Sequence, residues 1–398
     1  MSLTRHFARH WSLDPNVIFL NHGSFGACPI EVLNTQAELR ARLERQPVQF
    51  FVRDFEPMLD ASRASLADFI GAETEDVVFV PNATTGVNAV LRSRDFAPGD
   101  DLLVTNHEYN ACRNALDFVA KRFGARVVVA EIPFPIRSAD EAVDAILGAV
   151  TPNTRLALLD HITSQSALVL PLERIVPSLR ERGIDVLVDG AHAPGMIDLN
   201  VTAVGATYYS GNCHKWVCAP KGAGFLWVER SRQPEVRPLT ISHGANVARS
   251  DRSRYRLEFD WTGTDDPTAA LCVGKSIEVM ASLVPGGWPE IRRRNHALAL
   301  TGRDHVCDAL GIPAPAPDAM IGSIAAFPIP DGSPEPPSNP LYADPLQESL
   351  LADHRVEVPI IPWPAPPKRV LRISAQLYNV EADYEALAGA LRTALGTG

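Results

Sequence analysis

Lysine is scarce in this chain of 398 residues, where only five of the 37 basic side chains are lysine. The formal net charge is −10, and no part of the sequence gathers basic residues into a stripe. A protein that binds nucleic acid needs such a positive surface. The sequence therefore predicts no nucleic-acid partner.

Cysteine pairs and long apolar runs are also missing. The six cysteines form no Cys-x-x-Cys pair, so we expect no metal site. No apolar run approaches the ~18 residues of a membrane-spanning helix. Residues 1–15 carry charge and lack the apolar core of a signal peptide. These features predict a cytoplasmic protein with reduced thiols and no membrane contact.

Short apolar segments alternate with helical segments through the first two thirds of the chain. Such alternation is typical of an α/β fold, in which a mostly parallel sheet is covered by helices on both faces. No Gly-x-Gly-x-x-Gly motif follows an early strand, which disfavours a dehydrogenase of the Rossmann type. The segments that we expect to be strands are residues 76–81, 101–105, 126–132, 155–160, 185–189, 207–210 and 224–228.

The pattern changes after about residue 265. Residues 267–311 have a helical pattern, strands are expected at 321–327, 356–361 and 369–374, and a helix at 381–395 closes the chain. A chain of this length is expected to form about two domains. We predict a large domain at residues 16–265, and a smaller α+β domain from residues 1–15 and 266–398. The proline-rich region 313–367 is expected to form ordered loops near the site.

Two residues point to a chemistry. Asp189 ends an apolar strand, where a carboxylate is costly unless it has a partner, and Lys215 lies in a polar and aromatic turn. A lysine amine can form a Schiff base with an aldehyde cofactor, and a carboxylate can keep a pyridine nitrogen protonated. The pair therefore indicates pyridoxal 5′-phosphate (PLP). For Asp189 alone, a helix cap or an ion pair is the alternative.

Other candidates follow the expected strands at their carboxyl ends, where parallel sheets bind ligands. Thr84 and Thr85 open a helix and either cradle a phosphate or cap the helix. Tyr109 either stacks on a planar ring or packs in its loop. His192 either contacts a ring oxygen or a substrate carboxylate, or is a turn residue without a role. Asn212 and His214 are able to donate to a phosphate.

Six motifs together resemble the class V aminotransferase superfamily, and in particular its isopenicillin N epimerase-like branch. The resemblance covers residues 17–395, and its motifs are specific for PLP binding and much less so for the reaction. The motifs are Phe19–Pro29 (FLNHGSFGACP), Asn82–Val90, Asp160–Pro171 (DHITSQSALVLP), Val188–Gly195 (VDGAHAPG), His214–Trp216 and Arg372–Ser374.

The resemblance implies PLP fold type I and a homodimer whose active site is shared between subunits. It implies Lys215, Asp189 and His192 as catalytic residues, and Arg372 as the residue that binds the substrate carboxylate. The further residues implied are Thr84 or Thr85, Asn212 and His214 for the phosphate, Thr264 for the phosphate in the other subunit, Tyr109 for ring stacking, Ser164 or Gln165 near the ring hydroxyl, and Asn21 near the substrate.

Three reactions on an amino acid remain open. These are epimerisation or racemisation, elimination by a carbon–sulfur lyase or cysteine desulfhydrase, and transamination, while a non-catalytic binding protein is disfavoured by the intact motifs. Epimerisation benefits from a second acid, for which Tyr109 and His22 are candidates. The chain has no cysteine after Cys307, so a desulfurase that works through an enzyme persulfide is disfavoured.

Overall fold

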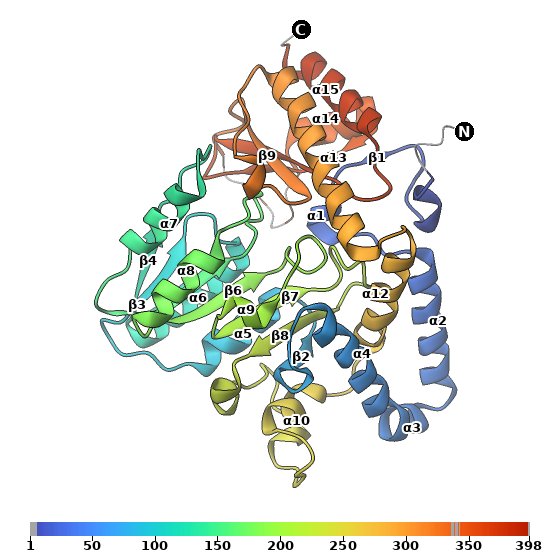
Figure 1. The fold of residues 1–398 in the computed structure, drawn as a ribbon, viewed down its shortest axis with the longest axis vertical. Helices are drawn as coiled ribbons and strands as arrows, with labels where there is room; N and C mark the ends of the chain where they lie inside the picture. Colours follow the sequence, from blue (N-terminus) through green and yellow to red (C-terminus); the bar gives the residue numbers. More distant parts are fainter. Residues whose placement is uncertain (1–5, 336–337, 339–340, 342, 397–398) are drawn as a thin grey trace.

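The computed structural model describes residues 6–335, 338, 341 and 343–396 (Figure 1). The smaller predicted domain also includes residues 1–5 and 397–398, which lie outside the described residues. The same holds for 336–337, 339–340 and 342 of the proline-rich region.

A seven-stranded sheet forms the centre of the fold, in the order β2-β8-β7-β6-β5-β3-β4. All neighbours pair in parallel except β8, which runs antiparallel to both β2 and β7. The predicted α/β sheet is thereby confirmed, although β4 ends earlier than expected. The strands are β2 (Val77–Val80), β3 (Asp101–Thr105), β4 (Arg126–Ala130), β5 (Thr154–Asp160), β6 (Asp185–Gly190), β7 (Tyr208–Asn212) and β8 (Gly224–Val228).

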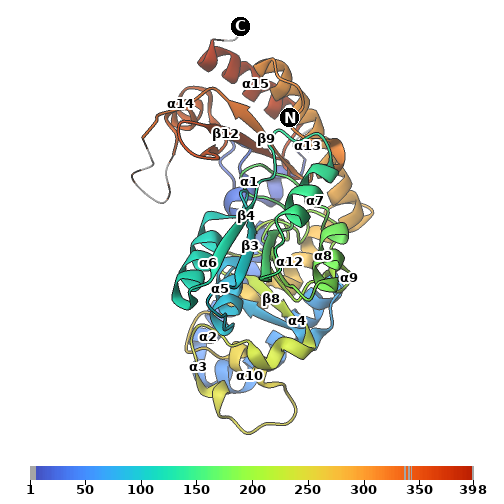
Figure 2. The ribbon, with the colours of Figure 1, turned by 90° about the vertical axis from the view of Figure 1, so that its left-hand side faces the viewer.

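Side chains alternate between the two faces of this sheet, as the pleat requires. On β3, for example, Leu102 and Val104 belong to one apolar cluster, whereas Leu103 belongs to the other. Figure 2 shows helices on both faces of the sheet. Helices α5 (Ala83–Ser93) and α6 (Asn110–Phe123) cover one face, and α7 (Ala139–Gly148) and α8 (Leu172–Glu181) cover the other.

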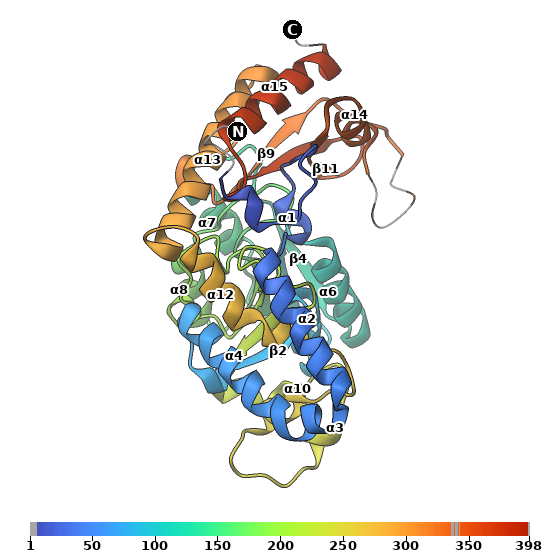
Figure 3. The same cartoon turned by 90° about the vertical axis from the view of Figure 1, so that its right-hand side faces the viewer.

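Two long helices near the N-terminus were not anticipated from the sequence. Helices α2 (Ile30–Arg45) and α4 (Phe55–Phe69) pack with α12 (Val273–Ser282), and the three lie side by side in Figure 3. Arg63 on α4 is fully buried and donates 2.7 Å to the Val77 carbonyl and 2.6 Å to the Asp260 carboxylate. This arginine ties α4 to the edge strand β2 and to α10 (Arg254–Asp260).

A second, three-stranded antiparallel sheet has the order β11-β12-β9, formed by Ile360–Pro362, Arg369–Ser374 and Ile324–Ile329. It carries α13 (Gly287–Leu310), α14 (Pro345–His354) and α15 (Glu381–Leu395) at one end of the molecule (Figure 1). No single helix among the described residues has the length and hydropathy to cross a membrane. The segments Thr268–Ser282 and Gly287–Leu310 have the required length and hydropathy only when they are taken together, and the pair is bent by 72°.

The predicted strand at residues 356–361 is in fact two strands with different partners. β10 (Val356–Glu357) pairs in parallel with β1 (Ile18–Phe19), and β11 begins at Ile360 and pairs with β12. Pro359 between them has no N–H for a ladder, which explains the break. The β1–β10 pair holds the N-terminal motif against the C-terminal part of the chain.

The N-terminal motif also turns closely against the loop that carries Lys215. Gly26 has a φ of +72°, and a Cβ atom at this position would collide with the carbonyl oxygen of His214. Only glycine therefore fits without displacing the backbone of that loop. The side chains that follow β7 and those of the N-terminal motif are thus placed together by one tight backbone contact.

We expect Gly26→Ala to lower the free energy of unfolding by about 3 kcal/mol, because it combines a strained φ with overpacking. Gly389→Ala is the matched control, since Gly389 lies within α15 and has open space around it. The control is expected to gain about 0.5–1 kcal/mol from helix propensity. Chemical denaturation of both variants measures the difference, and wild-type stability of Gly26→Ala would contradict the constraint.

Candidate active site

A cavity of about 450 Å³ opens at the carboxyl ends of the parallel strands, the edge at which such sheets bind ligands. The turns after β2, β3, β5, β6 and β7 line it, together with Ser24 and Phe25 of the N-terminal motif. The cavity brings together nine of the predicted residues, namely Thr84, Thr85, Tyr109, Ser164, Asp189, His192, Asn212, His214 and Lys215.

Lys215 lies in the loop between β7 and β8 and points its amine into the cavity. Its Nζ atom is 3.0 Å from Nε2 of His192, and its backbone carbonyl accepts a 3.0 Å hydrogen bond from Nε2 of His22. Loss of water around the amine, assisted by the Arg372 cation, lowers the pKa of Lys215 to about 7. About half of the amine is therefore neutral, and nucleophilic, at pH 7.

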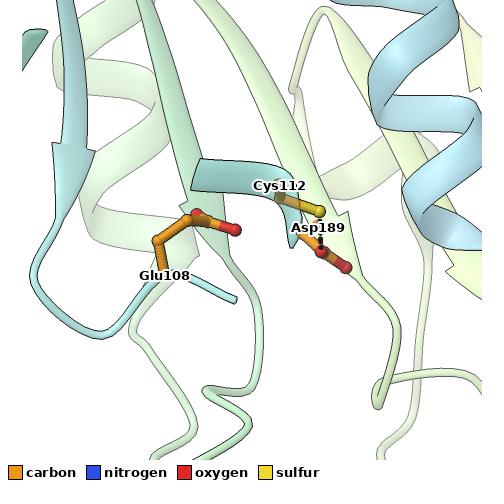
Figure 4. Close-up of side chains that lie close together, drawn as sticks. All are labelled: Glu108, Cys112 and Asp189. Carbon is orange, nitrogen blue, oxygen red and sulfur yellow. Dashed lines mark hydrogen bonds between the residues drawn. The ribbon is translucent and has the colours of Figure 1, made fainter. Parts of the chain in front are cut away.

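Asp189 ends β6 and is only 2% exposed. Its Oδ1 atom accepts a hydrogen bond of 2.9 Å from the Ala191 N–H, and Oδ2 accepts one of 3.0 Å from the Cys112 thiol (Figure 4). Burial raises the pKa of this carboxyl above its usual range. Within the described residues no cationic side chain forms an ion pair with Asp189, so the ion-pair alternative finds no support.

Two further buried acids surround Asp189. Asp160 is its neighbour across the β5–β6 register, and Glu108 offers an oxygen within 4.8 Å of the Cys112 sulfur and the Asp189 carboxylate (Figure 4). The pKa values of Glu108 and Asp160 lie well above their usual ranges. Burial is the main cause, and repulsion from the neighbouring carboxylates is the second. This favours neutral Glu108 and Asp160, and leaves the negative charge on Asp189, which has two hydrogen-bond donors.

The first turn of α5 lines a further part of the cavity. Asn82 caps this helix by accepting hydrogen bonds from the N–H and the hydroxyl of Thr85, at 2.9 and 3.0 Å. Asn212 accepts from the N–H of Ala83 at 2.8 Å. Thr84 and Thr85 are thus first-turn residues and not caps. The positive end of the helix dipole makes this part of the cavity suitable for an anion.

His214 lines the same part of the cavity. Its Nδ1 atom donates to the Ala223 carbonyl at 3.0 Å, so the neutral ring has only an acceptor left at Nε2. Burial, assisted by the nearby Lys215, lowers the pKa of His214 to about 4. The ring can donate to a phosphate only as the imidazolium, a form that a bound dianion would stabilise.

Arg372 on β12 is 2% exposed, which excludes a role as a surface strand residue. It donates to the Ser164 carbonyl at 2.6 Å and to the Ser24 hydroxyl at 3.0 Å. Its Nε atom has no partner, and no carboxylate pairs with it among the described residues. Burial lowers the pKa of Arg372 to about 10, so it stays cationic at neutral pH. A buried cation without a counter-ion provides a site for an anion.

Five predicted residues do not line the cavity. Arg372 reaches it through its contacts with the lining residues Ser24 and Ser164, and Gln165 is the second. The other three are Asn21, Thr264 and His22. Asn21 contacts it only indirectly, because its Oδ1 atom accepts a 2.5 Å hydrogen bond from Ser24. Thr264 lies in a separate hollow with Phe51 and Asp266. His22 is fully buried, and both of its ring nitrogens are used, at 2.8 Å from the Tyr378 hydroxyl and 3.0 Å from the Lys215 carbonyl. The prediction of His22 as a second acid is therefore wrong.

Several residues at the site were missed by sequence reasoning. Ser24 orients Arg372 and lies within the quoted N-terminal motif, so the motif gave a signal for it. Glu108 and Cys112 come from the β3–α6 connection and the first turn of α6, whereas Asp160 ends β5, and no spacing shows that they converge on Asp189. Trp216 was singled out only as a neighbour of Lys215, whereas its indole contacts His192.

The fold and the site together define a class of protein. The model of the family "Aminotransferase class-V" matches residues 31–387, and the chain belongs to this family, whose members are PLP-dependent enzymes. The resemblance drawn from the motifs is thereby confirmed.

The curated relatives at 31–34% identity divide between two activities. The chain is 34% identical to an isopenicillin N epimerase from Amycolatopsis lactamdurans, over 96% of each chain. It is 31% identical to a probable chloroplastic L-cysteine desulfhydrase from Arabidopsis thaliana, over 97% of this chain and 84% of that protein.

Solved structures confirm the predicted fold type I. The apo cysteine desulfurase from Thermococcus onnurineus NA1 superimposes with a TM-score of 0.80 at 19% identity, over 100% of this chain and 99% of that one. A cystine C–S lyase in complex with its reaction product cysteine persulfide gives 0.78 at 20% identity, over 95% and 97%. At these identities the likeness concerns the fold alone.

The environment of Lys215 gives a pH prediction. In cofactor-free protein, its reaction with a small aldehyde and a reductant is expected to be half-maximal near pH 7, because the neutral amine is the reactive form and increases as pH rises through the pKa. Peptide mass spectrometry follows each lysine separately. Lys275, whose pKa is raised by hydrogen bonds to Glu31 and Glu278, is the internal reference. A half-maximal pH for Lys215 as high as that of Lys275 would contradict the assignment.

Proposed function

We propose that the chain uses PLP to act at the α-carbon of an amino acid, as an epimerase or racemase of the isopenicillin N epimerase-like kind. A carbon–sulfur lyase or cysteine desulfhydrase is the second candidate, because the relatives divide between these activities. An aminotransferase is the third. One observation carries the proposal: Lys215, an amine with a lowered pKa, lines a cavity whose wall residues Ser24 and Ser164 hold Arg372, a cation that no carboxylate pairs with among the described residues.

The side chains that line the cavity have the chemistry that each part of PLP requires. Bound PLP supplies an aldehyde for the lysine and a ring that takes up the electrons of a bond broken at the α-carbon. Asp189 is a buried carboxylate with both oxygens hydrogen-bonded, which suits pairing with a ring N–H. Thr84, Asn212 and His214 would hold the phosphate beside the start of α5. Tyr109 would stack on the ring, and Ser164 and His192 would lie near its hydroxyl.

The chain's own residues then divide the work on the substrate. Arg372 would bind the α-carboxylate with the guanidinium that Ser24 and Ser164 already orient. Lys215 would remove the α-proton as a neutral amine and would then hold it as an ammonium group, the form that can return it. With His22 excluded, Tyr109 remains the candidate for an acid on the other side of the substrate, since its side chain is 42% exposed and lines the cavity.

Sulfur transfer through an enzyme cysteine is disfavoured. All six cysteines are buried, and none lines the cavity among the residues that the structure describes. Cys307, the last cysteine of the chain, lies in α13. An elimination that releases sulfide directly requires no cysteine and stays compatible with this arrangement.

We also propose a cytoplasmic homodimer in which the partner subunit completes the cavity. Thr264 and Phe51 line the same hollow. Near Phe51 in the sequence, the apolar side chains of Val48 and Val52 are 62% and 72% exposed. Phe25, at the cavity itself, is 62% exposed. Covering such side chains with a second copy would shield them from water and bring a Thr264 to each site.

The reaction is tested by incubating the PLP-loaded protein with L- and D-amino acids in heavy water. Deuterium at the α-carbon with loss of chirality and no keto acid would identify an epimerase. Pyruvate and sulfide from cysteine would identify a lyase, and keto acid without sulfide an aminotransferase. Lys215→Ala is expected to abolish the visible absorbance of the bound cofactor and all three reactions. Absence of any cofactor absorbance in the wild type would refute the proposal.

Arg372→Ala is expected to weaken binding of an amino acid about 30- to 150-fold, because charged hydrogen bonds of about 2–3 kcal/mol are lost. An absorbance titration of the bound cofactor gives the dissociation constant. The matched control is the amide of the same amino acid, which has no carboxylate and is expected to bind both proteins within about threefold of each other. Equal losses for the acid and its amide would place the carboxylate site elsewhere.

A further inference from the structure

The ring of His192 is fixed by two neighbours. The indole N–H of Trp216 donates to Nδ1 at 3.3 Å, and Nζ of Lys215 lies 3.0 Å from Nε2. An indole nitrogen is only a donor, so Nδ1 must be the acceptor of that bond. Burial, followed by the nearby Lys215 and Arg372 cations, lowers the pKa of His192 well below its usual range. The neutral ring therefore carries its hydrogen on Nε2.

This tautomer determines which form of Lys215 is favoured. An Nε2–H directed at Nζ finds an acceptor only in the lone pair of a neutral amine, because an ammonium group has donors alone. The opposite tautomer would present a lone pair to Lys215 and would favour the ammonium form. The choice of tautomer at His192 thus influences the charge of the lysine next to it.

Trp216 is itself held firmly. It is 1% exposed, and its ring lies 4.8 Å from that of His22, which Tyr378 and the Lys215 carbonyl fix in turn. The direction of the indole N–H is therefore set by packing. Trp216 directly follows Lys215 in the same loop, and both side chains contact the ring of His192.

We propose that Trp216 is a positioning residue, which holds His192 in the Nε2–H tautomer and thereby keeps the Lys215 amine neutral and ready to react. The inference rests on the proposed function for its catalytic meaning, whereas the tautomer and the charge are properties of the cofactor-free chain. Other charged or titratable groups also act on the pair, and Trp216→Phe leaves them in place. They are Arg372, Asp189, Asp160 and Cys112 around Lys215, and Arg372, His22 and His214 around His192.

The test uses nuclear magnetic resonance on the full-length, cofactor-free protein. Five lysines give few signals when the ε-carbon is labelled with ¹³C, and Lys215→Arg identifies the signal of interest. The wild-type signal is expected to titrate near pH 7. Trp216→Phe is expected to raise this midpoint by about one pH unit, the equivalent of one hydrogen bond. Labelling histidine with ¹⁵N reports the tautomer of His192, identified with His192→Leu.

Two controls separate the tautomer from simple packing. Trp227→Phe removes another buried indole, on β8, whose N–H has no partner within the described residues, and it is expected to leave the Lys215 midpoint unchanged. In a His192→Leu background, Trp216→Phe is expected to have no further effect on Lys215, because the group that it acts through is gone.

Two results would overturn the proposal. One is an Nδ1–H tautomer of His192 in the wild type, a measurement that does not depend on whether Trp216→Phe folds. The other is an equal shift of the Lys215 midpoint by Trp216→Phe with and without His192. Because these measurements need no cofactor, failure of the protein to bind PLP would defeat the proposed function and leave this test intact.

Discussion

The candidate site depends on charged groups that lose water without gaining an ion-pair partner. Within the part of the chain that the structure describes, buried Arg372 donates only to a carbonyl and hydroxyls, and Asp189 accepts only from an N–H and a thiol. Neutral partners of this kind orient a charge but do not cancel it. Each group therefore keeps a large part of its capacity to bind an opposite charge, and the same loss of water lowers the pKa of Lys215.

In this fold, the ion pairs lie away from the charged groups that are proposed to bind ligands. One example is the pair of Arg63 and Asp260 beneath the edge strand β2. The antiparallel strand β8 returns the chain on one side of β7, and β6 lies on the other side. The loop between β7 and β8 carries Lys215 to within 3.0 Å of His192, which follows β6. Gly26 lets the N-terminal motif approach the same loop, which brings Ser24 within reach of Arg372.

Local sequence patterns predicted the central sheet well, because each buried strand is a short apolar run bounded by turns. They also predicted most cavity residues, because parallel strands end at one edge of the sheet. The misses have a common cause in contacts between distant segments. Pro359 redirects residues 356–361 to two partners, His22 is enclosed by Tyr378 and the Lys215 carbonyl, and Cys112 meets Asp189. No periodicity or motif in one segment reports such pairings.

The choice among reactions depends on groups other than the lysine. Under the proposed function, proton removal by Lys215 would be common to epimerisation, elimination and transamination, so the features that the family shares do not distinguish these reactions. What distinguishes them is the acid on the other side of the substrate and the group at its β-carbon. Both ring nitrogens of His22 are in use, and no cysteine lines the cavity among the described residues. Tyr109 is therefore the remaining candidate for the acid on the other side of the substrate. Its phenol has a pKa raised mainly by burial, so it stays protonated at neutral pH and has a proton to give.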